Sequence, residues 1–110
     1  NYSLGVVTNG NADLKIIGID YLFDYCFSAA DLNAHKPDPI MFEAVIDKTG
    51  LKANEICHIG DHPINDVKAS LDFGMIPIWF NYEKQNFPLE EIQVAEFSDW
   101  SSLPNLIKSL

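Results

Sequence analysis

The stretch EICHIGDHPINDV, residues 55–67, contains the change of pattern on which the fold prediction depends. A short apolar run ending at a glycine predicts a buried strand over 55–60. A proline suited to a first helical turn and a glycine suited to a helix end then predict a helix over 63–74. Two carboxylates, Asp61 and Asp66, flank the turn between them. The stretch therefore predicts a β-α unit with acidic side chains at the carboxyl end of its strand, where ligands bind in parallel sheets.

The alternation of strand and helix continues on both sides of this stretch. We predict further strands over 4–7, 25–28, 75–80 and 94–97, helices over 12–19, 39–49 and 98–110, and a polar loop over 29–39. Strands that are apolar throughout and alternate with helices are typical of a parallel sheet covered on both faces. We therefore predict an α/β fold, a Rossmann-like three-layer α/β/α parallel sheet, over the single domain 1–110.

Composition restricts the partners of this acidic chain. With seven lysines, no arginine and a formal net charge of −9 in 110 residues, it does not suit nucleic acid, which binds clustered positive charge. No apolar run reaches the ~20 residues of a membrane span, and no signal peptide pattern occurs, so we expect no membrane partner. Cys26 and Cys57 lie in apolar segments, which predicts buried, unpaired thiols and a cytoplasmic location.

A candidate anion site combines two loops that follow predicted strands. Thr8 offers a hydroxyl, and the backbone N–H groups of Asn9 and Gly10 can point at a phosphate oxygen. Lys36, between His35 and a proline, is the candidate positive charge. Two plainer interpretations stay open, because Thr-Asn-Gly also forms a good turn and Lys36 could be a solvated loop residue.

A candidate cation site follows the strand over 55–60. Asp61 and Asp66 suit Mg²⁺, which takes one or two carboxylates together with water and substrate phosphate. The alternative is that Asp61 or Asn65 caps the following helix while Asp66 interacts with its positive end, and capping does not exclude the metal.

Two histidines and a cysteine lie close to these carboxylates in the sequence. His58, inside the strand, is interpreted as a packed or hydrogen-bonded residue, whereas His62, in the loop, could face a ligand. Zinc ligation by Cys57, His58, Asp61 and His62 is disfavoured, because neighbouring strand residues point to opposite faces of a sheet.

Three segments together resemble a known superfamily. The segments LGVVTNG (4–10), KPDPIMFEAV (36–45) and HIGDHPINDVKASLDFGM (58–75) resemble the second, third and fourth motifs of the haloacid dehalogenase (HAD) superfamily, in the same order. The resemblance implies that Thr8 and Lys36 hold the phosphoryl group as catalytic residues, that Asp61 binds Mg²⁺, and that Asp66 supports the metal directly or through water.

The first motif of that superfamily, an Asp-x-Asp pair with the nucleophile, does not occur in this sequence. In the superfamily this motif ends a central strand that is followed by a cap domain. The resemblance therefore implies that the chain is the C-terminal part of a HAD-like core domain, without its first strand and cap, an interpretation that a start without Met also favours. We expect two strand pairs that lack their shared neighbour, with unpaired edges and an exposed core, and no covalent catalysis by residues 1–110 alone.

The function implied by the resemblance is a Mg²⁺-dependent phosphatase of a small phosphorylated metabolite, acting through an aspartyl-phosphate intermediate in the intact protein. The TNGNA segment (8–12) resembles bacterial phosphatases of flavin mononucleotide and of a phosphorylated ribitylaminouracil. Dehalogenases of the same superfamily need no Mg²⁺, and the pair Asp61 and Asp66 favours a phosphatase. The alternatives are a degenerate binding module without catalysis and a receiver domain of two-component signalling, although a receiver has its acidic pair first and its Lys-Pro last.

Overall fold

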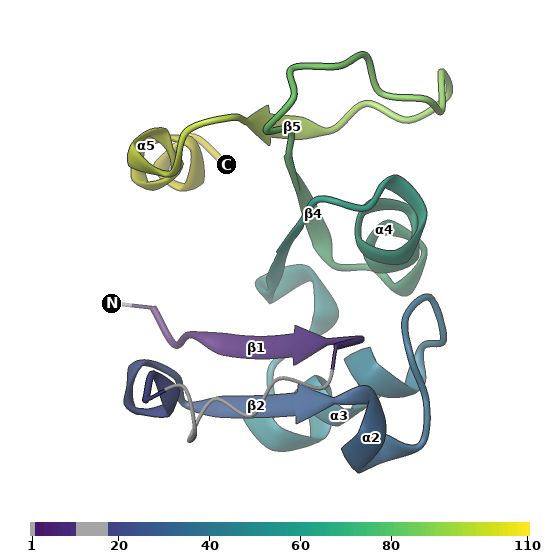
Figure 1. Ribbon diagram of the computed structural model, residues 1–110, viewed down its shortest axis with the longest axis vertical. Coiled ribbons are helices and arrows are strands. Elements are labelled where there is room, and N and C mark those ends of the chain that lie inside the picture. Colours follow the sequence, from purple (N-terminus) through teal and green to yellow (C-terminus); the bar gives the residue numbers. More distant parts are fainter. Residues whose placement is uncertain (1, 11–17) are drawn as a thin grey trace. The chain divides into compact units, whose positions relative to one another are not determined.

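The structure is a computed structural model that describes residues 2–10 and 18–110 (Figure 1). It divides into two compact units, Asn1–Gly50 and Leu51–Leu110, each with its own parallel sheet. All strand pairs recorded among the described residues are parallel, which confirms the α/β class expected from the alternating pattern. The described residues form two separate sheets, as the resemblance implies for a chain without the strand of the first motif, although the second sheet has three strands and not two.

The first unit contains a two-stranded sheet, in which β1 (Gly5–Thr8) pairs with β2 (Tyr25–Ser28) so that Thr8 lies opposite Ser28. A 3-10 turn, η1 (Asp20–Leu22), precedes β2, and α2 (Ala29–Leu32) and α3 (Ile40–Thr49) follow it, both in contact with β2. Figure 1 shows β1 and β2 side by side, with α2 beginning where β2 ends. Both loops with candidate phosphate ligands therefore follow this sheet.

The helix α3 forms for the reasons that the sequence indicates. Its inward positions are apolar, and Met41, Phe42 and Val45 are buried. It ends at Gly50, whose φ of 70° is a left-handed conformation that glycine adopts at little cost.

In this unit one predicted loop contains a helix, and one predicted helix lies mostly outside the described residues. The loop predicted over 29–39 contains the short helix α2, because the Ser28 hydroxyl accepts a hydrogen bond from Asp31 N at 3.2 Å and so caps it. The predicted helix over 12–19 falls mainly on residues 11–17, outside the described residues.

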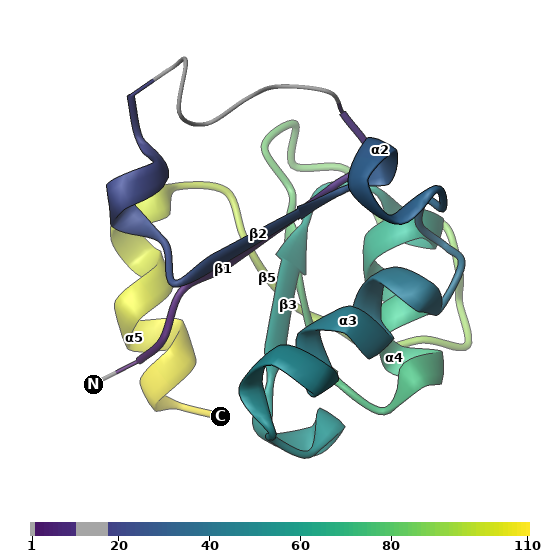
Figure 2. The ribbon, with the colours of Figure 1, turned by 90° about the horizontal axis from the view of Figure 1, so that it is seen from below.

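The second unit has a three-stranded sheet in the order β3 (Cys57–Gly60), β4 (Ile76–Phe80), β5 (Ala95–Phe97). Between β3 and β4 lie the π-helical segment η3 (Pro63–Lys68) and α4 (Ala69–Phe73), and η4 (Trp100–Ser102) and α5 (Leu103–Lys108) follow β5. A 3-10 turn, η2 (Ala53–Glu55), precedes β3. Within this unit α4 and α5 cover opposite faces of the sheet (Figure 2), as predicted.

The strand predictions for the second unit are confirmed, and β5 lies at a sheet edge. The predicted helix over 63–74 consists of the π-helical segment η3 followed by the α-helix α4. Its first turn is wide because Val67 N donates to His62 O at 3.2 Å, five residues back. Gly74 ends α4 with a φ of 101°.

The prediction that both cysteines are buried is wrong for Cys26, which is exposed, whereas Cys57 is half-buried. Cys26 lies on β2 between Tyr25 and Phe27, whose rings are 5.6 Å apart, and alternate strand residues point to opposite faces. Apolar sequence neighbours therefore do not determine the exposure of the thiol.

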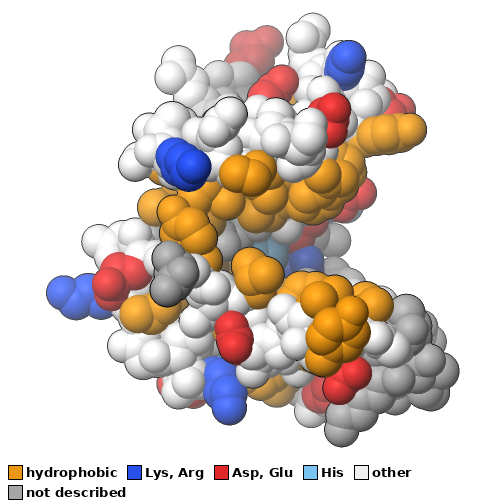
Figure 3. All heavy atoms as spheres, turned by 90° about the vertical axis from the view of Figure 1, so that its left-hand side faces the viewer, with side chains coloured by type: hydrophobic (Ala, Val, Ile, Leu, Met, Phe, Trp, Pro, Cys, Tyr) orange, Lys and Arg blue, Asp and Glu red, His pale blue; other side chains and the backbone are white. Residues whose placement is uncertain are grey.

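Hydrophobic side chains reach the surface in both units, and Figure 3 shows several on the face that it draws. Within the described ranges, no helix has the length and apolar character that crossing a membrane would require.

Candidate functional site

Thr8 is the last residue of β1, and its side chain organises the turn that follows. Its hydroxyl Oγ1 accepts a hydrogen bond from Gly10 N at 2.9 Å. A hydroxyl that accepts one bond keeps its own hydrogen for donation, so Thr8 can still donate to an anion. The hydroxyl hydrogen of Thr8 therefore stays available to a ligand, whereas the Gly10 N–H, predicted to face a phosphate oxygen, already donates to Thr8 Oγ1.

Asn9 and Lys36, from loops 27 residues apart, are joined by two hydrogen bonds. Lys36 N donates to Asn9 Oδ1 at 2.7 Å, and Asn9 Nδ2 donates to Lys36 O at 3.0 Å. The side-chain amide of Asn9 thus pairs with the backbone of Lys36, whereas the sequence indicates a role only for the backbone N–H of Asn9. The Lys36 side chain is largely buried, and the Lys36–Pro37 peptide bond is cis. The structure therefore brings these two predicted residues together.

Asp61 is the first residue after β3, and its side chain is exposed. Within the described part of the chain its carboxylate makes no hydrogen bond, whereas its backbone carbonyl accepts one from Trp79 Nε1 at 3.0 Å. The Asp61 carboxylate is consequently open to a ligand while its backbone is held. This arrangement suits a metal ligand at the carboxyl end of a parallel strand.

Asp66 lies five residues further on and is buried, with 5% of its surface exposed. Its Oδ1 lies 3.0 Å from His58 Nε2, and its Oδ2 accepts a hydrogen bond from His62 N at 3.1 Å. Gly60 permits this close approach, because a Cβ at that position would overlap the Asp66 side chain. Asp66 therefore connects strand β3, the loop and η3.

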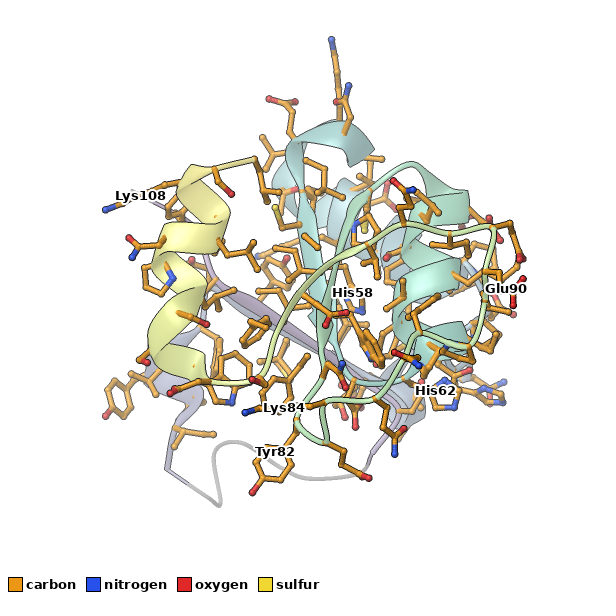
Figure 4. All side chains as sticks on the ribbon, turned by 90° about the horizontal axis from the view of Figure 1, so that it is seen from above. His58, His62, Tyr82, Lys84, Glu90 and Lys108 are labelled. Atoms are coloured by element: carbon orange, nitrogen blue, oxygen red, sulfur yellow. The ribbon has the colours of Figure 1, made fainter. Side chains whose placement is uncertain are left out.

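The two histidines have different roles. The interpretation of His58 as hydrogen-bonded is confirmed by its contact with Asp66. His62 is exposed, and its Nδ1 accepts bonds from Ile64 N at 3.1 Å and Asn65 N at 3.0 Å. The helix cap is therefore His62, and the prediction of Asp61 or Asn65 as the cap is wrong. Figure 4 shows His58 between the strands and α4, and His62 at the periphery.

Magnesium fits the donor set of this loop. In the described ranges, no three His, Cys, Asp or Glu side chains cluster closely enough to hold a metal ion together. Mg²⁺ needs fewer protein ligands, since one or two carboxylates suffice when water and phosphate complete its shell. The exposed carboxylate of Asp61 is of the ligand type that Mg²⁺ takes. Cys57 is a poor ligand by contrast, because burial raises the pKa of its thiol.

Comparison with known proteins identifies the family. The family model described as haloacid dehalogenase-like hydrolase matches residues 1–80. The chain belongs to this family. The match includes all three segments on which the resemblance rested, and it sets aside the receiver domain.

Relatives of the chain include phosphatases and dehalogenases. The chain is 28% identical, over 96% of its length and 46% of the relative's, to the 5-amino-6-(5-phospho-D-ribitylamino)uracil phosphatase YigB of Escherichia coli. It is 35% identical, over 56% of its length and 29% of the relative's, to (S)-2-haloacid dehalogenase 4A of Burkholderia cepacia. The crystal structure of a 2-haloacid dehalogenase from Pseudomonas syringae matches with a TM-score of 0.93 and 33% identity, over 98% of this chain and 47% of that one. The chain thus spans less than half the length of each.

Proposed function

We propose that the protein containing this chain is a Mg²⁺-dependent phosphatase of a small phosphorylated metabolite. The observation that carries the proposal is the exposed carboxylate of Asp61 at the end of β3, beside the buried, hydrogen-bonded Asp66. An open carboxylate at this position favours a Mg²⁺-dependent phosphatase, which needs such a metal ligand, over a dehalogenase that works without a metal.

The first unit contributes the groups that hold the phosphoryl moiety in this proposal. Thr8 donates its remaining hydroxyl hydrogen, the N–H group of Asn9 approaches a phosphate oxygen, and Lys36 supplies positive charge. The Gly10 N–H holds the turn through its hydrogen bond to Thr8 Oγ1. The double hydrogen bond between Asn9 and Lys36 supports these assignments, because it holds the backbone that carries the cation next to the turn that carries the donors. A fixed charge stabilises a transition state better than a mobile one.

Asp61 binds the metal in this proposal, and Asp66 supports it by holding the backbone of the loop. When bound, Mg²⁺ would act as a Lewis acid that neutralises charge on the transferring phosphoryl group. The attacking carboxylate would come from an Asp-x-Asp pair, which residues 1–110 do not contain. The proposed route therefore has two steps, formation and hydrolysis of an aspartyl-phosphate, and residues 1–110 by themselves are inactive.

The substrate class follows from a relative and is part of the proposal. The YigB phosphatase is named for a phosphorylated ribitylaminouracil, and it aligns with 96% of this chain. We propose a phosphorylated metabolite of comparable size. Haloacid dehalogenation is the second candidate function, favoured by the identity and TM-score of the Pseudomonas syringae dehalogenase.

The two functions are distinguished by assaying the full-length protein that contains this chain. Phosphate release from p-nitrophenyl phosphate is measured with and without Mg²⁺, and chloride release from 2-chloropropionate is measured in parallel. We expect phosphate release that requires Mg²⁺ and no chloride release. Chloride release without Mg²⁺ would establish the dehalogenase instead, and no turnover of either compound would favour the degenerate binding module.

Two variants test the residue assignments in the same assay. Asp61→Asn and Lys36→Ala should each lower kcat for phosphate release by about 10²-fold or more, because each removes a charge that stabilises the transition state. Asp72→Asn and Lys108→Ala are the matched controls, since both residues are exposed and lie in helices away from the strand ends. If Asp61→Asn and Lys36→Ala behaved like their controls, the assignment would be wrong.

A further inference from the structure

The peptide group between Asp61 and His62 is held from both sides. Its carbonyl oxygen, on Asp61, accepts a hydrogen bond from Trp79 Nε1 at 3.0 Å. Its N–H, on His62, donates to Asp66 Oδ2 at 3.1 Å. Both polar atoms of one peptide plane therefore have a side-chain partner, which fixes the orientation of the plane directly after the Asp61 Cα atom.

Trp79 is well placed for this role, because parallel pairing of β3 with β4 puts it opposite Gly60. Its side chain can therefore reach the carbonyl group of Asp61, the first residue after β3, although Trp79 lies 18 residues away from Asp61 in the sequence. An indole has one donor and no acceptor, so a buried tryptophan satisfies that N–H with a single partner. Here the partner is the loop that carries the proposed metal ligand.

The indole ring is itself fixed. Trp79 is 4% exposed, and its ring packs edge-on against Phe87, with centroids 4.9 Å apart and an interplanar angle of 80°. A buried ring in such a contact has little freedom to rotate. The donor is consequently held in place before any ligand binds.

We propose that Trp79 is a positioning residue for Asp61: its indole N–H fixes the Asp61–His62 peptide, and thereby directs the Asp61 carboxylate toward a divalent cation. This inference rests on the proposed metal-binding role of Asp61. Asp66 acts on the other side of the same peptide. In this proposal Trp79 acts on metal binding through the backbone of Asp61 and not by contact with the cation or the substrate.

The test measures metal affinity directly in the full-length protein, with Mn²⁺ as a probe observed by electron paramagnetic resonance. Trp79 is replaced by phenylalanine, and in a second variant by benzothienylalanine, which keeps the size of the indole and lacks its N–H. Both should bind Mn²⁺ about three- to tenfold more weakly, the size expected for loss of one hydrogen bond. Trp100→Phe is the matched control, because Trp100 is 57% exposed and its ring packs against Phe80 and Phe97; this variant should bind Mn²⁺ as the wild type does.

The melting temperature of each Trp79 variant, measured without metal, reports the loss of packing, whereas the Mn²⁺ affinity reports the loss of positioning. The benzothienylalanine variant keeps the contact with Phe87, so a pure packing role predicts unchanged Mn²⁺ affinity in that variant. Unchanged affinity in it would overturn the proposal even if Trp79→Phe lowered the melting temperature. A wild-type protein that bound no Mn²⁺ would overturn the metal part of the proposed function, and this inference with it. If the wild type bound Mn²⁺ and both Trp79 variants bound it as tightly as the wild type, this inference alone would be overturned.

Discussion

At the scale of single residues, the candidate sites depend on side chains that form hydrogen bonds to the backbone of other loop residues. Asn9 shows this, because its amide both donates to and accepts from the backbone of Lys36. A neutral amide can do this since it carries an acceptor and a donor on one planar group. The position of Lys36 therefore depends on the chemistry of Asn9 and not only on its size.

Asn9→Asp tests this dependence with almost no change of shape. The carboxylate can still accept from Lys36 N, but its second oxygen would face the Lys36 carbonyl, which is also an acceptor. In the full-length protein we expect a loss of about 1–3 kcal/mol in the free energy of unfolding, measured by urea denaturation. We also expect inorganic phosphate to inhibit about tenfold more weakly. Asn54→Asp adds the same charge at an exposed site in the second unit and should leave both quantities close to the wild type.

The hydrogen-bond partners of the site residues could not be predicted from the sequence, and the reason is physical. The strand ends locate Thr8, Lys36 and Asp61, because short apolar runs and the turn residues after them are local signals. The partners of these residues are not local. The donor to Asp61 lies 18 residues away, and the partner of Asn9 lies 27 residues away, so only the folded register brings them together.

At the scale of elements, the C-terminal helix depends on its cap. η4 and α5 together are short, and Asp99 precedes them with Oδ1 accepting from Ser101 N and from Ser101 Oγ, both at 2.9 Å. These two hydrogen bonds lower the pKa of the Asp99 carboxyl. The folded state thus favours the ionised cap.

The lowered pKa gives a definite pH dependence. Because the folded-state pKa of Asp99 lies below the unfolded value, its stabilisation is present above the unfolded pKa and is lost as the pH falls through the folded pKa. Asp99→Asn keeps an acceptor that does not titrate. The melting temperature of the wild type minus that of Asp99→Asn should therefore be largest near pH 7 and should decrease in acid.

Ser101→Ala gives an independent check on the cause, because it removes only the hydroxyl donor to Asp99. We expect the pKa of Asp99, followed by NMR titration of the carboxyl carbon, to rise toward its usual range in this variant. If the difference in melting temperature between the wild type and Asp99→Asn did not vary with pH, the capping role of Asp99 would be contradicted.

Helices and strands are predicted well where a regular apolar pattern ends at a recognisable turn or capping residue. All five strands and the helix α3 fall where the apolar runs and the glycines place them. The errors are at helix starts. His62 rather than a carboxylate caps η3, and Ser28 starts α2 inside a stretch interpreted as loop, because the polar atom that takes a cap depends on side-chain rotamers that the sequence pattern does not encode.

At the scale of the whole molecule, the open sheet edges are the main feature. β3 has β4 on one side only, and β1 and β2 form a sheet of two strands, so both are edge strands among the described residues. Two-stranded sheets are marginal by themselves, and edge strands leave backbone groups unpaired. Together with the missing Asp-x-Asp pair, this favours a parent protein in which a further strand pairs with these edges.

Hydrogen exchange measured by mass spectrometry can test for that strand by comparing residues 1–110 with the full-length protein. Peptides from β1 and β3 should exchange markedly more slowly in the full-length protein, because a new neighbour pairs their outward N–H groups. β4 is the internal reference, since it already lies between β3 and β5 and should be protected in both samples if residues 1–110 fold. Equal exchange of β3 in the two samples, with β4 protected in both, would mean that no strand joins this edge, and the source of the nucleophile would have to be sought elsewhere.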